Sequence, residues 1–133
     1  MGTRSTTKIY DEWGRLVLSL YKQFDGYHDG WGNDLKTFIK EGTFVNGIPL
    51  VLNFKENRLH NGAADFGLNL VKEFKDGPGN IYATHEDDLQ SYNYKIEFEA
   101  IKGECFSIKI SSDKKNNDFD EIFITDNTGK IIS

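Results

Sequence analysis

The chain has 133 residues, 38% of them hydrophobic and 28% charged, which is enough for one buried core and too few for two ordinary domains. Its net charge of −5 argues against a dedicated binder of duplex nucleic acid, because Lys and Arg contacts to phosphate supply most of that affinity. A single cysteine, Cys105, excludes an intrachain disulfide, and no apolar run approaches the roughly 20 residues that cross a bilayer. We therefore expect one soluble domain over residues 1–133 in a reducing, cytoplasmic compartment.

The N-terminal third predicts a β-hairpin, a glycine-rich loop and a short helix. The leucines of "LVLSL" alternate with a period of two, and the β-branched segment 3–10 precedes them across the turn "DEWG". After the loop, Leu35, Phe38 and Ile39 form an apolar stripe at helical spacing, with Asn33 as the expected N-cap.

A second helix and several strands follow. The segment 61–74 carries the helical stripe of Ala63, Phe66, Leu70 and Phe74, which we expect Leu68 to widen. "SYNYKIEFEA" alternates apolar and polar residues, "ECFSIKISS" answers it across the turn "IKG", and "NIYATHE" and "DFDEIFITD" predict further strands. The segment 45–60 is less legible: it is expected to hold either a short strand at 50–54 or an irregular connection, and Pro49 argues against a central strand.

The resulting order, β-β-α-α-β-β-β-β, predicts an α+β fold. We expect a mainly antiparallel sheet of about five to seven strands with both helices packed on one of its faces. The strands near the chain ends are expected to be exposed, so that edge pairing would allow a homo-oligomer.

The loop from Gln23 to Asp34, "QFDGYHDGWGND", holds three glycines, three aspartates and three aromatic residues. A glycine-rich turn from a strand into a helix suits a phosphate, but the aspartates would repel one and the loop has no Lys or Arg. The spacing of Asp25, Asp29 and Asn33 by four residues does not match the alternate ligands of an EF-hand calcium loop.

Two other interpretations of this loop remain open. In one, it is structural: glycines allow positive φ, aspartates form turns and aromatic rings cover the edge of the core. In the other, it is a recognition surface, on which Tyr27 and Trp31 offer flat rings while Gln23, Asp25 and His28 offer hydrogen bonds.

No catalytic constellation is complete. His28 lies near aspartates, but no Ser, Cys or Thr motif supplies a nucleophile. "THEDD" at 84–88 offers His85 and three carboxylates, which fit a solvated loop better. Nothing in the spacing of the three histidines predicts a metal site, and we predict no cofactor.

Three motifs resemble those of a family of small proteins found in phages, prophages and some bacterial genomes. They are "GTRS" at 2–5, "YKQFDGY" at 21–27 and "GWG" at 30–32, and the likeness extends over about residues 2 to 98. The resemblance implies an accessory protein of a mobile element. It also implies that one constellation is formed by Arg4, Gln23, Asp25, Gly26, Tyr27 and Gly30. An Arg4–Asp25 pair beside a tyrosine would act as a ligand clamp or as a structural staple.

We therefore expect a non-enzymatic binding protein in the host cytoplasm that binds a host protein or sequesters a small nucleotide-like molecule to counter antiviral defence. The alternatives are a small metal-dependent hydrolase or nuclease and a structural virion or assembly component. The candidate ligand-binding residues are Arg4, Gln23, Asp25, Gly26, Tyr27, His28 and Trp31.

Overall fold

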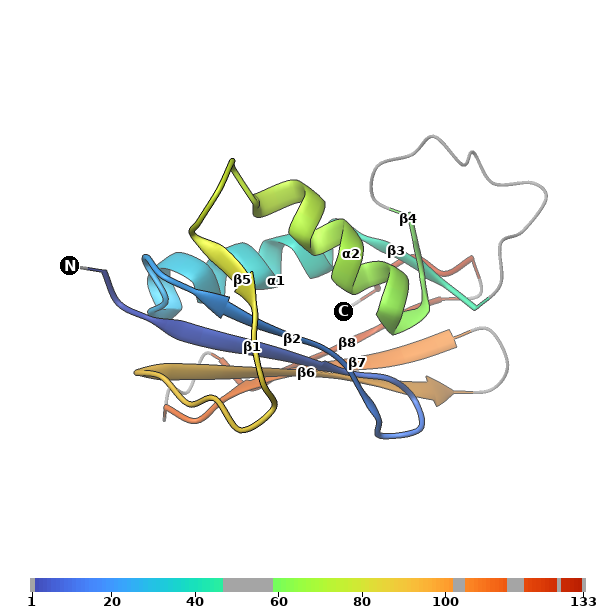
Figure 1. Cartoon of the computed structure of the whole chain (residues 1–133). Coiled ribbons are helices and arrows are strands. Elements are labelled where there is room, and N and C mark those ends of the chain that lie inside the picture. The colour runs from blue at the N-terminus through green and yellow to red at the C-terminus, as the bar shows by residue number, and fades with distance from the viewer. Residues whose placement is uncertain (1, 47–58, 102–104, 115–118, 127, 133) are drawn as a thin grey trace.

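The structure is a computed structural model that describes residues 2–46, 59–101, 105–114, 119–126 and 128–132. These residues form a six-stranded sheet in the order β5-β2-β1-β6-β7-β8, with two α-helices on one face (Figure 1). A smaller parallel pair joins β3 to β4. The elements are β1 (Ser5–Tyr10), β2 (Leu16–Lys22), η1 (His28–Gly32), α1 (Asn33–Lys40), β3 (Thr43–Val45), β4 (Leu59–Asn61), α2 (Gly62–Phe74), β5 (Ile81–Ala83), β6 (Tyr92–Ile101), β7 (Cys105–Ser112) and β8 (Glu121–Ile124).

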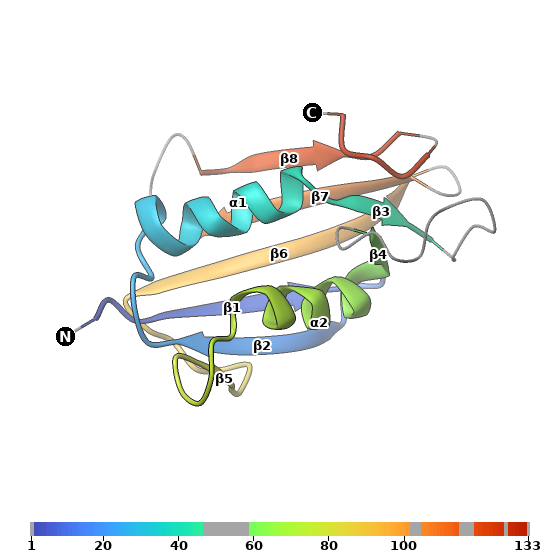
Figure 2. The same ribbon diagram turned by 90° about the horizontal axis from the view of Figure 1, so that it is seen from above.

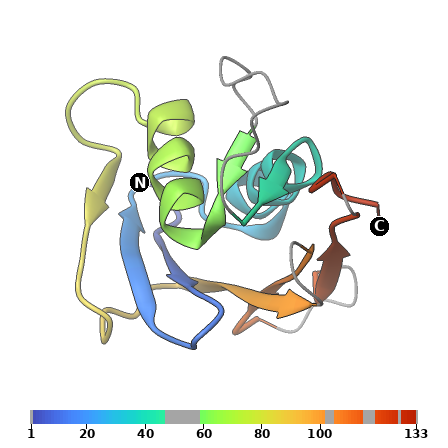
Figure 3. The ribbon, with the colours of Figure 1, turned by 90° about the vertical axis from the view of Figure 1, so that its right-hand side faces the viewer.

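The predicted α+β fold is confirmed, and so is the mainly antiparallel sheet with both helices on one face. Within the six-stranded sheet, four of the five strand pairs are antiparallel, and β1 with β6 is the parallel one. Helix α2 lies over β1 and β2, and α1 lies over the other half of the sheet (Figure 2). Seen end-on, the helices form one layer and the sheet the other, so the sheet has a helix-free face (Figure 3).

Alternation sets the register of the longest strand pair. Ile96 and Phe98 of β6 are buried beneath the helices and pair with Ile110 and Ile108 of β7, while Lys95 points to the helix-free face. A shift of one residue would move all of these apolar side chains to the solvent side, so the burial of one face specifies this register.

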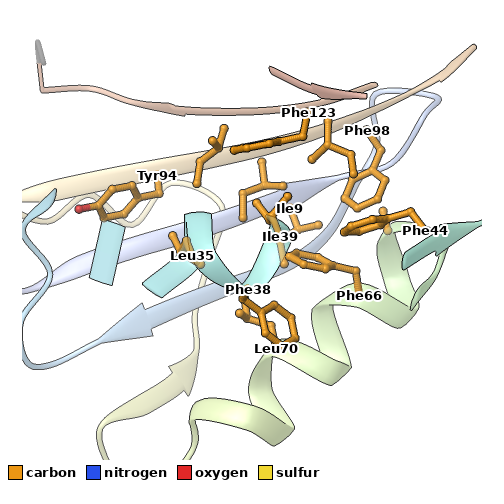
Figure 4. Close-up of a cluster of buried hydrophobic side chains, with 14 of the residues drawn as sticks. Ile9, Leu35, Phe38, Ile39, Phe44, Phe66, Leu70, Tyr94, Phe98 and Phe123 are labelled. Atoms are coloured by element: carbon orange, nitrogen blue, oxygen red, sulfur yellow. The ribbon is translucent and has the colours of Figure 1, made fainter. Parts of the chain in front are cut away.

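The centre of the core is a group of aromatic rings between the helices and the sheet (Figure 4). Phe66 of α2 lies 5.7 Å from Phe44 of β3, 5.6 Å from Phe98 of β6 and 5.6 Å from Phe38 of α1, measured between ring centroids. These separations are those of favourable tilted ring pairs. One ring of α2 thus joins both helices, the small sheet and the large sheet.

The first strand is not at an edge. Because β1 has β2 on one side and β6 on the other, the expectation that the N-terminal strand is free for edge pairing is wrong. The two edges are β5 and β8. At the β5 edge, Lys75 Nζ donates to the carbonyl oxygen of Ile81 over 2.8 Å, which occupies a backbone acceptor that another strand would need.

Two helix details also differ from the prediction. Leu68 is exposed, because it lies on the side of α2 that faces away from Phe66 and Leu70. Asn33 does not cap α1: the helical turn η1 runs directly into it, and the Asn33 side chain donates instead to the carbonyl oxygen of Asp29 over 3.3 Å. The strand expected at 50–54 lies outside the described residues. Within them, no helix is long and apolar enough to span a membrane.

Two positions on α2 test this core. Phe66→Ala removes a fully buried ring and should lower the free energy of unfolding by about 3–5 kcal/mol. Leu68→Ala, two residues away on the exposed side, should change it by no more than about 0.5 kcal/mol. Urea unfolding followed by circular dichroism measures both, and equal effects would contradict the described orientation of α2.

Candidate functional site

The loop after β2 is held to the end of the sheet by its backbone. Gly26 N donates to the carbonyl oxygen of Thr3 over 2.8 Å, and Trp31 N donates to that of Asp25 over 2.7 Å. The Tyr94 hydroxyl donates to the carbonyl oxygen of Gly26 over 2.5 Å. Burial raises the pKa of Tyr94, so this hydroxyl keeps its proton and remains a donor. The loop is therefore anchored to β6 and to the N-terminal segment.

The glycines of the loop serve close packing rather than positive φ. A Cβ added to Gly26 would lie 2.6 Å from the Cβ of Ser5, and one added to Gly30 would lie 2.6 Å from the backbone oxygen of Asp25. The residue with positive φ is Asp25 itself, at 58°. This conformation is strained for a residue with a side chain, although Asp tolerates it better than most.

Trp31 is a core residue, so the expectation that its ring faces a ligand is wrong. It is only 1% exposed, and its Nε1 donates to Thr7 Oγ1 of β1 over 2.8 Å. Its ring meets that of Phe74 edge-on, with 5.1 Å between centroids. Trp31 therefore fastens the loop to the inner face of the sheet.

His28 is half-buried and packed among rings. Its ring stacks on Phe119 at 4.6 Å and 14°, and its Nε2 lies 2.9 Å from Ser112 Oγ. Burial lowers the pKa of His28, opposed by the charges of Asp29 and Asp113, while Lys36 lowers it further. The neutral form of His28 is therefore favoured. Through its contact with Ser112, His28 joins the loop to the end of β7.

Gln23 and Arg4 have different surroundings. Gln23 Oε1 accepts a hydrogen bond from the Tyr21 hydroxyl at 2.5 Å, so this side chain is already engaged within β2 and the loop. Arg4 is exposed, and its backbone oxygen accepts from Tyr92 N. Within the described residues no ion pair joins Arg4 to Asp25, so the expected clamp between them is not formed.

The loop keeps two aromatic side chains in solvent. Phe24 is 50% exposed and Tyr27 is 40% exposed, on either side of the strained Asp25. We call Arg4, Phe24, Asp25 and Tyr27 the loop surface. The prediction did not include Phe24. The sequence signal for Phe24 is the "DG" turn that directly follows it. Strand β2 ends before this turn, so the Phe24 ring lies outside the sheet.

Comparison with profiles of protein families, with curated proteins and with solved structures found no significant match to this chain. In the part of the chain that the structure describes, no three His, Cys, Asp or Glu side chains gather as a metal site.

The two tryptophans test the anchoring of the loop. Trp31→Ala should lower the free energy of unfolding by about 3–5 kcal/mol, because it empties a packed site. Trp31→Phe keeps most of the bulk but loses the hydrogen bond to Thr7, and should cost about 1–2 kcal/mol. Trp13→Ala, at a residue 69% exposed, should be nearly neutral. Chemical unfolding followed by circular dichroism measures all three.

The environment of His28 predicts a pH dependence of stability. Its pKa in the folded chain lies below the ordinary value of about 6.5, so the unfolded chain binds the proton first. The neutral His28 contributes fully to the stability of the fold above the ordinary histidine pKa of about 6.5. This contribution is lost as the pH falls towards the lowered pKa of His28 in the folded chain.

Wild type should therefore lose more stability than His28→Gln between about pH 7.5 and about pH 5.5 in urea titrations. The exposed His85 provides the matched control, because His85→Gln should behave like wild type. Identical losses in wild type and His28→Gln would refute the assignment.

Proposed function

We propose that the chain is a non-enzymatic binding protein that recognises a partner protein through the loop surface of Arg4, Phe24, Asp25 and Tyr27. The observation that carries the proposal is the pair of exposed rings at Phe24 and Tyr27 on a backbone whose Asp25–Gly26 peptide group is held by two hydrogen bonds. Aromatic side chains supply much of the binding energy at protein interfaces, since they bury a large area with few rotatable bonds.

Rigidity of the loop supports this interpretation. Positive φ at Asp25 costs about 1 kcal/mol or more, and such strain persists only where the surroundings enforce it. Here the bond from Trp31 N to the Asp25 oxygen and the bond from Gly26 N to Thr3 hold both polar atoms of the peptide group that follows the strained residue. A surface that is already ordered loses less conformational entropy on binding, which favours affinity.

Several hollows lined by described residues lie away from the loop surface. Two are on the helix-free face, and a third is between α1 and the end of α2. Phe24 and Tyr27 line none of these three. Small-molecule sites are concave, whereas protein partners use flat or convex surfaces.

In this proposal the chain is a phage-type accessory protein that binds a host protein in the bacterial cytoplasm and counters antiviral defence. The support for that context is the resemblance of the "GTRS" and "YKQFDGY" motifs. A nucleotide-like small molecule is the second candidate ligand. It is favoured by the exposed Arg4, which would oppose a negative charge beside a ring that stacks on a base.

The test removes the two rings and keeps the fold. Tagged wild type, the double variant Phe24→Ser/Tyr27→Ser and Trp13→Ser are expressed in a bacterial host and compared by quantitative co-purification and native mass spectrometry. Trp13 is the matched control, because it is an exposed aromatic residue in the turn at the opposite end of the β1–β2 hairpin.

We expect a stoichiometric protein partner with wild type and Trp13→Ser, reduced about tenfold or more with the double variant. A nucleotide-sized mass that is lost in the double variant would favour the second candidate instead. Equal recovery of a partner by all three proteins would contradict recognition through the loop surface.

A further inference from the structure

The helix-free face of the sheet is crossed by the connection from β5 to β6. This crossing segment, residues 84–91, passes over β2 and β1 on the side opposite the helices (Figures 1 and 3). Thr84 N donates to the carbonyl oxygen of Ser19 over 2.9 Å, and Ser19 Oγ donates to that of His85 over 3.2 Å. The crossing segment therefore covers the middle of that face and buries the side chains beneath it.

Lys8 of β1 is buried beneath this segment and has no direct counter-charge. It is only 8% exposed, and its Nζ donates to Thr6 Oγ1 over 3.1 Å and to the carbonyl oxygen of Asp88 over 2.8 Å. Both acceptors are neutral. Across the described residues, no carboxylate forms an ion pair with Lys8. An ammonium group has three N–H bonds, so one donor remains to be used.

The carboxylate of Asp88 is already hydrogen-bonded to other side chains. The Asp88 carboxylate accepts hydrogen bonds from Thr84 Oγ1 at 2.6 Å and from Gln90 Nε2 at 2.7 Å. The bond from Thr84 is the largest cause of the lowered pKa of Asp88, and the charge of Lys8 ranks below both side-chain bonds. The charge of Lys8 thus lowers the pKa of the Asp88 carboxyl, although the ammonium group contacts the backbone oxygen of Asp88 and not its carboxylate.

A buried cation without a contacting anion is unusual. Removing an ammonium group from water costs several kcal/mol unless a charge or enough hydrogen bonds replace the water, and lysines are rarely this buried unless they are paired. The position of Lys8 is therefore suited to an anion supplied from outside the chain.

A hollow of about 370 Å³ lies beside Lys8 on this face. Its lining includes the hydroxyl groups of Tyr10, Ser111 and Ser112 and a second ammonium group, that of Lys95, whose Nζ lies 3.6 Å from Glu97 Oε2. This volume falls in the range of small-molecule sites. The same residue that lacks a counter-charge therefore borders a space able to hold one.

The lining also includes two carboxylates, those of Asp113 and Glu86. Asp113 accepts from Asn93 N at 3.0 Å and from Asn93 Nδ2 at 2.7 Å. Glu86 lies close enough to Tyr10 that its charge, after burial, raises the pKa of the Tyr10 hydroxyl. Both carboxylates keep their negative charge, whereas Lys8 and Lys95 supply the positive charge of the hollow.

We propose that this hollow binds a compact anionic group, a carboxylate or a phosphate, with Lys8 as its buried charge partner and Lys95 at its rim. The site is on the helix-free face, separate from the loop surface. The result of its test is therefore independent of the proposed function.

The test is a titration of ¹⁵N-labelled protein with inorganic phosphate and, separately, with acetate, each against sodium chloride of equal ionic strength. We expect saturable amide shifts at Lys8, Asn93, Lys95 and Ser112 with one of these anions and none with chloride. The anion that saturates at the lower concentration identifies the preferred chemistry. Shifts that grow linearly with every salt, or no shifts, would overturn the proposal.

Variants locate the charge that is responsible. Lys8→Met keeps the aliphatic stem and should weaken binding about tenfold, the effect of losing one charge-assisted hydrogen bond. Lys109→Met is the matched control: it removes one positive charge from the same face, at a residue that lines the neighbouring hollow, and should leave the affinity within about twofold.

Lys95→Met provides a second variant at an exposed position, where folding is tolerant of change. It should weaken binding in the same direction as Lys8→Met, so the proposal remains testable even if Lys8→Met fails to fold. Equal affinity of wild type and Lys95→Met, or an equal loss in Lys109→Met, would refute the assigned site.

Discussion

Strand β1 lies in the middle of the sheet with a neighbour on each side, yet its segment 5–8 is both polar and buried. A buried polar side chain destabilises the fold unless it is hydrogen-bonded, so the position of this strand requires partners for its side chains on both faces of the sheet. On the helix side, Thr7 accepts the bond from Trp31 and thereby holds the glycine-rich loop. Among the described residues, Ser5 Oγ is the member of this segment without a partner.

On the helix-free side, the polar side chains of β1 also need partners, and their hydrogen bonds hold the crossing segment in place. Thr6 Oγ1 donates to Asn93 Oδ1 over 2.7 Å, and Lys8 bonds to the backbone of Asp88. Each bond contributes about 0.5–1.5 kcal/mol when formed, and a buried group left unpaired costs more than that. The loop surface lies at the end of the sheet and the hollow beside Lys8 lies on the helix-free face, but both are positioned by polar residues of one central strand. A substitution of one of these polar residues in β1 should therefore affect the structure on both faces of the sheet.

The elements that the sequence predicted well are those whose pattern is decided by burial of one face. The alternation of β6 and β7 and the stripe of Leu35, Phe38 and Ile39 were confirmed, because a period of 2 or 3.6 places apolar side chains on one side whatever the neighbours are. The hairpin of β1 and β2 was also confirmed, with Ser5 opposite Lys22. In the loop, the sequence indicated an unusual segment with an exposed Tyr27. It did not indicate that Trp31 would be buried in the core while Phe24 stays exposed.

The sequence by itself determined the α+β class, the faces of the strands and the glycine-rich loop between β2 and α1, since these follow from local periodicity and turn chemistry. Only the tertiary structure decided that Trp31 is inside and Phe24 outside, that β1 is central, and that Lys8 is buried beside a hollow. Those outcomes depend on contacts between segments far apart in the chain: Trp31 meets Thr7, and Lys8 meets the backbone of Asp88. Local patterns carry no information about which distant partner will satisfy a polar group, and that choice sets the environment of both proposed sites.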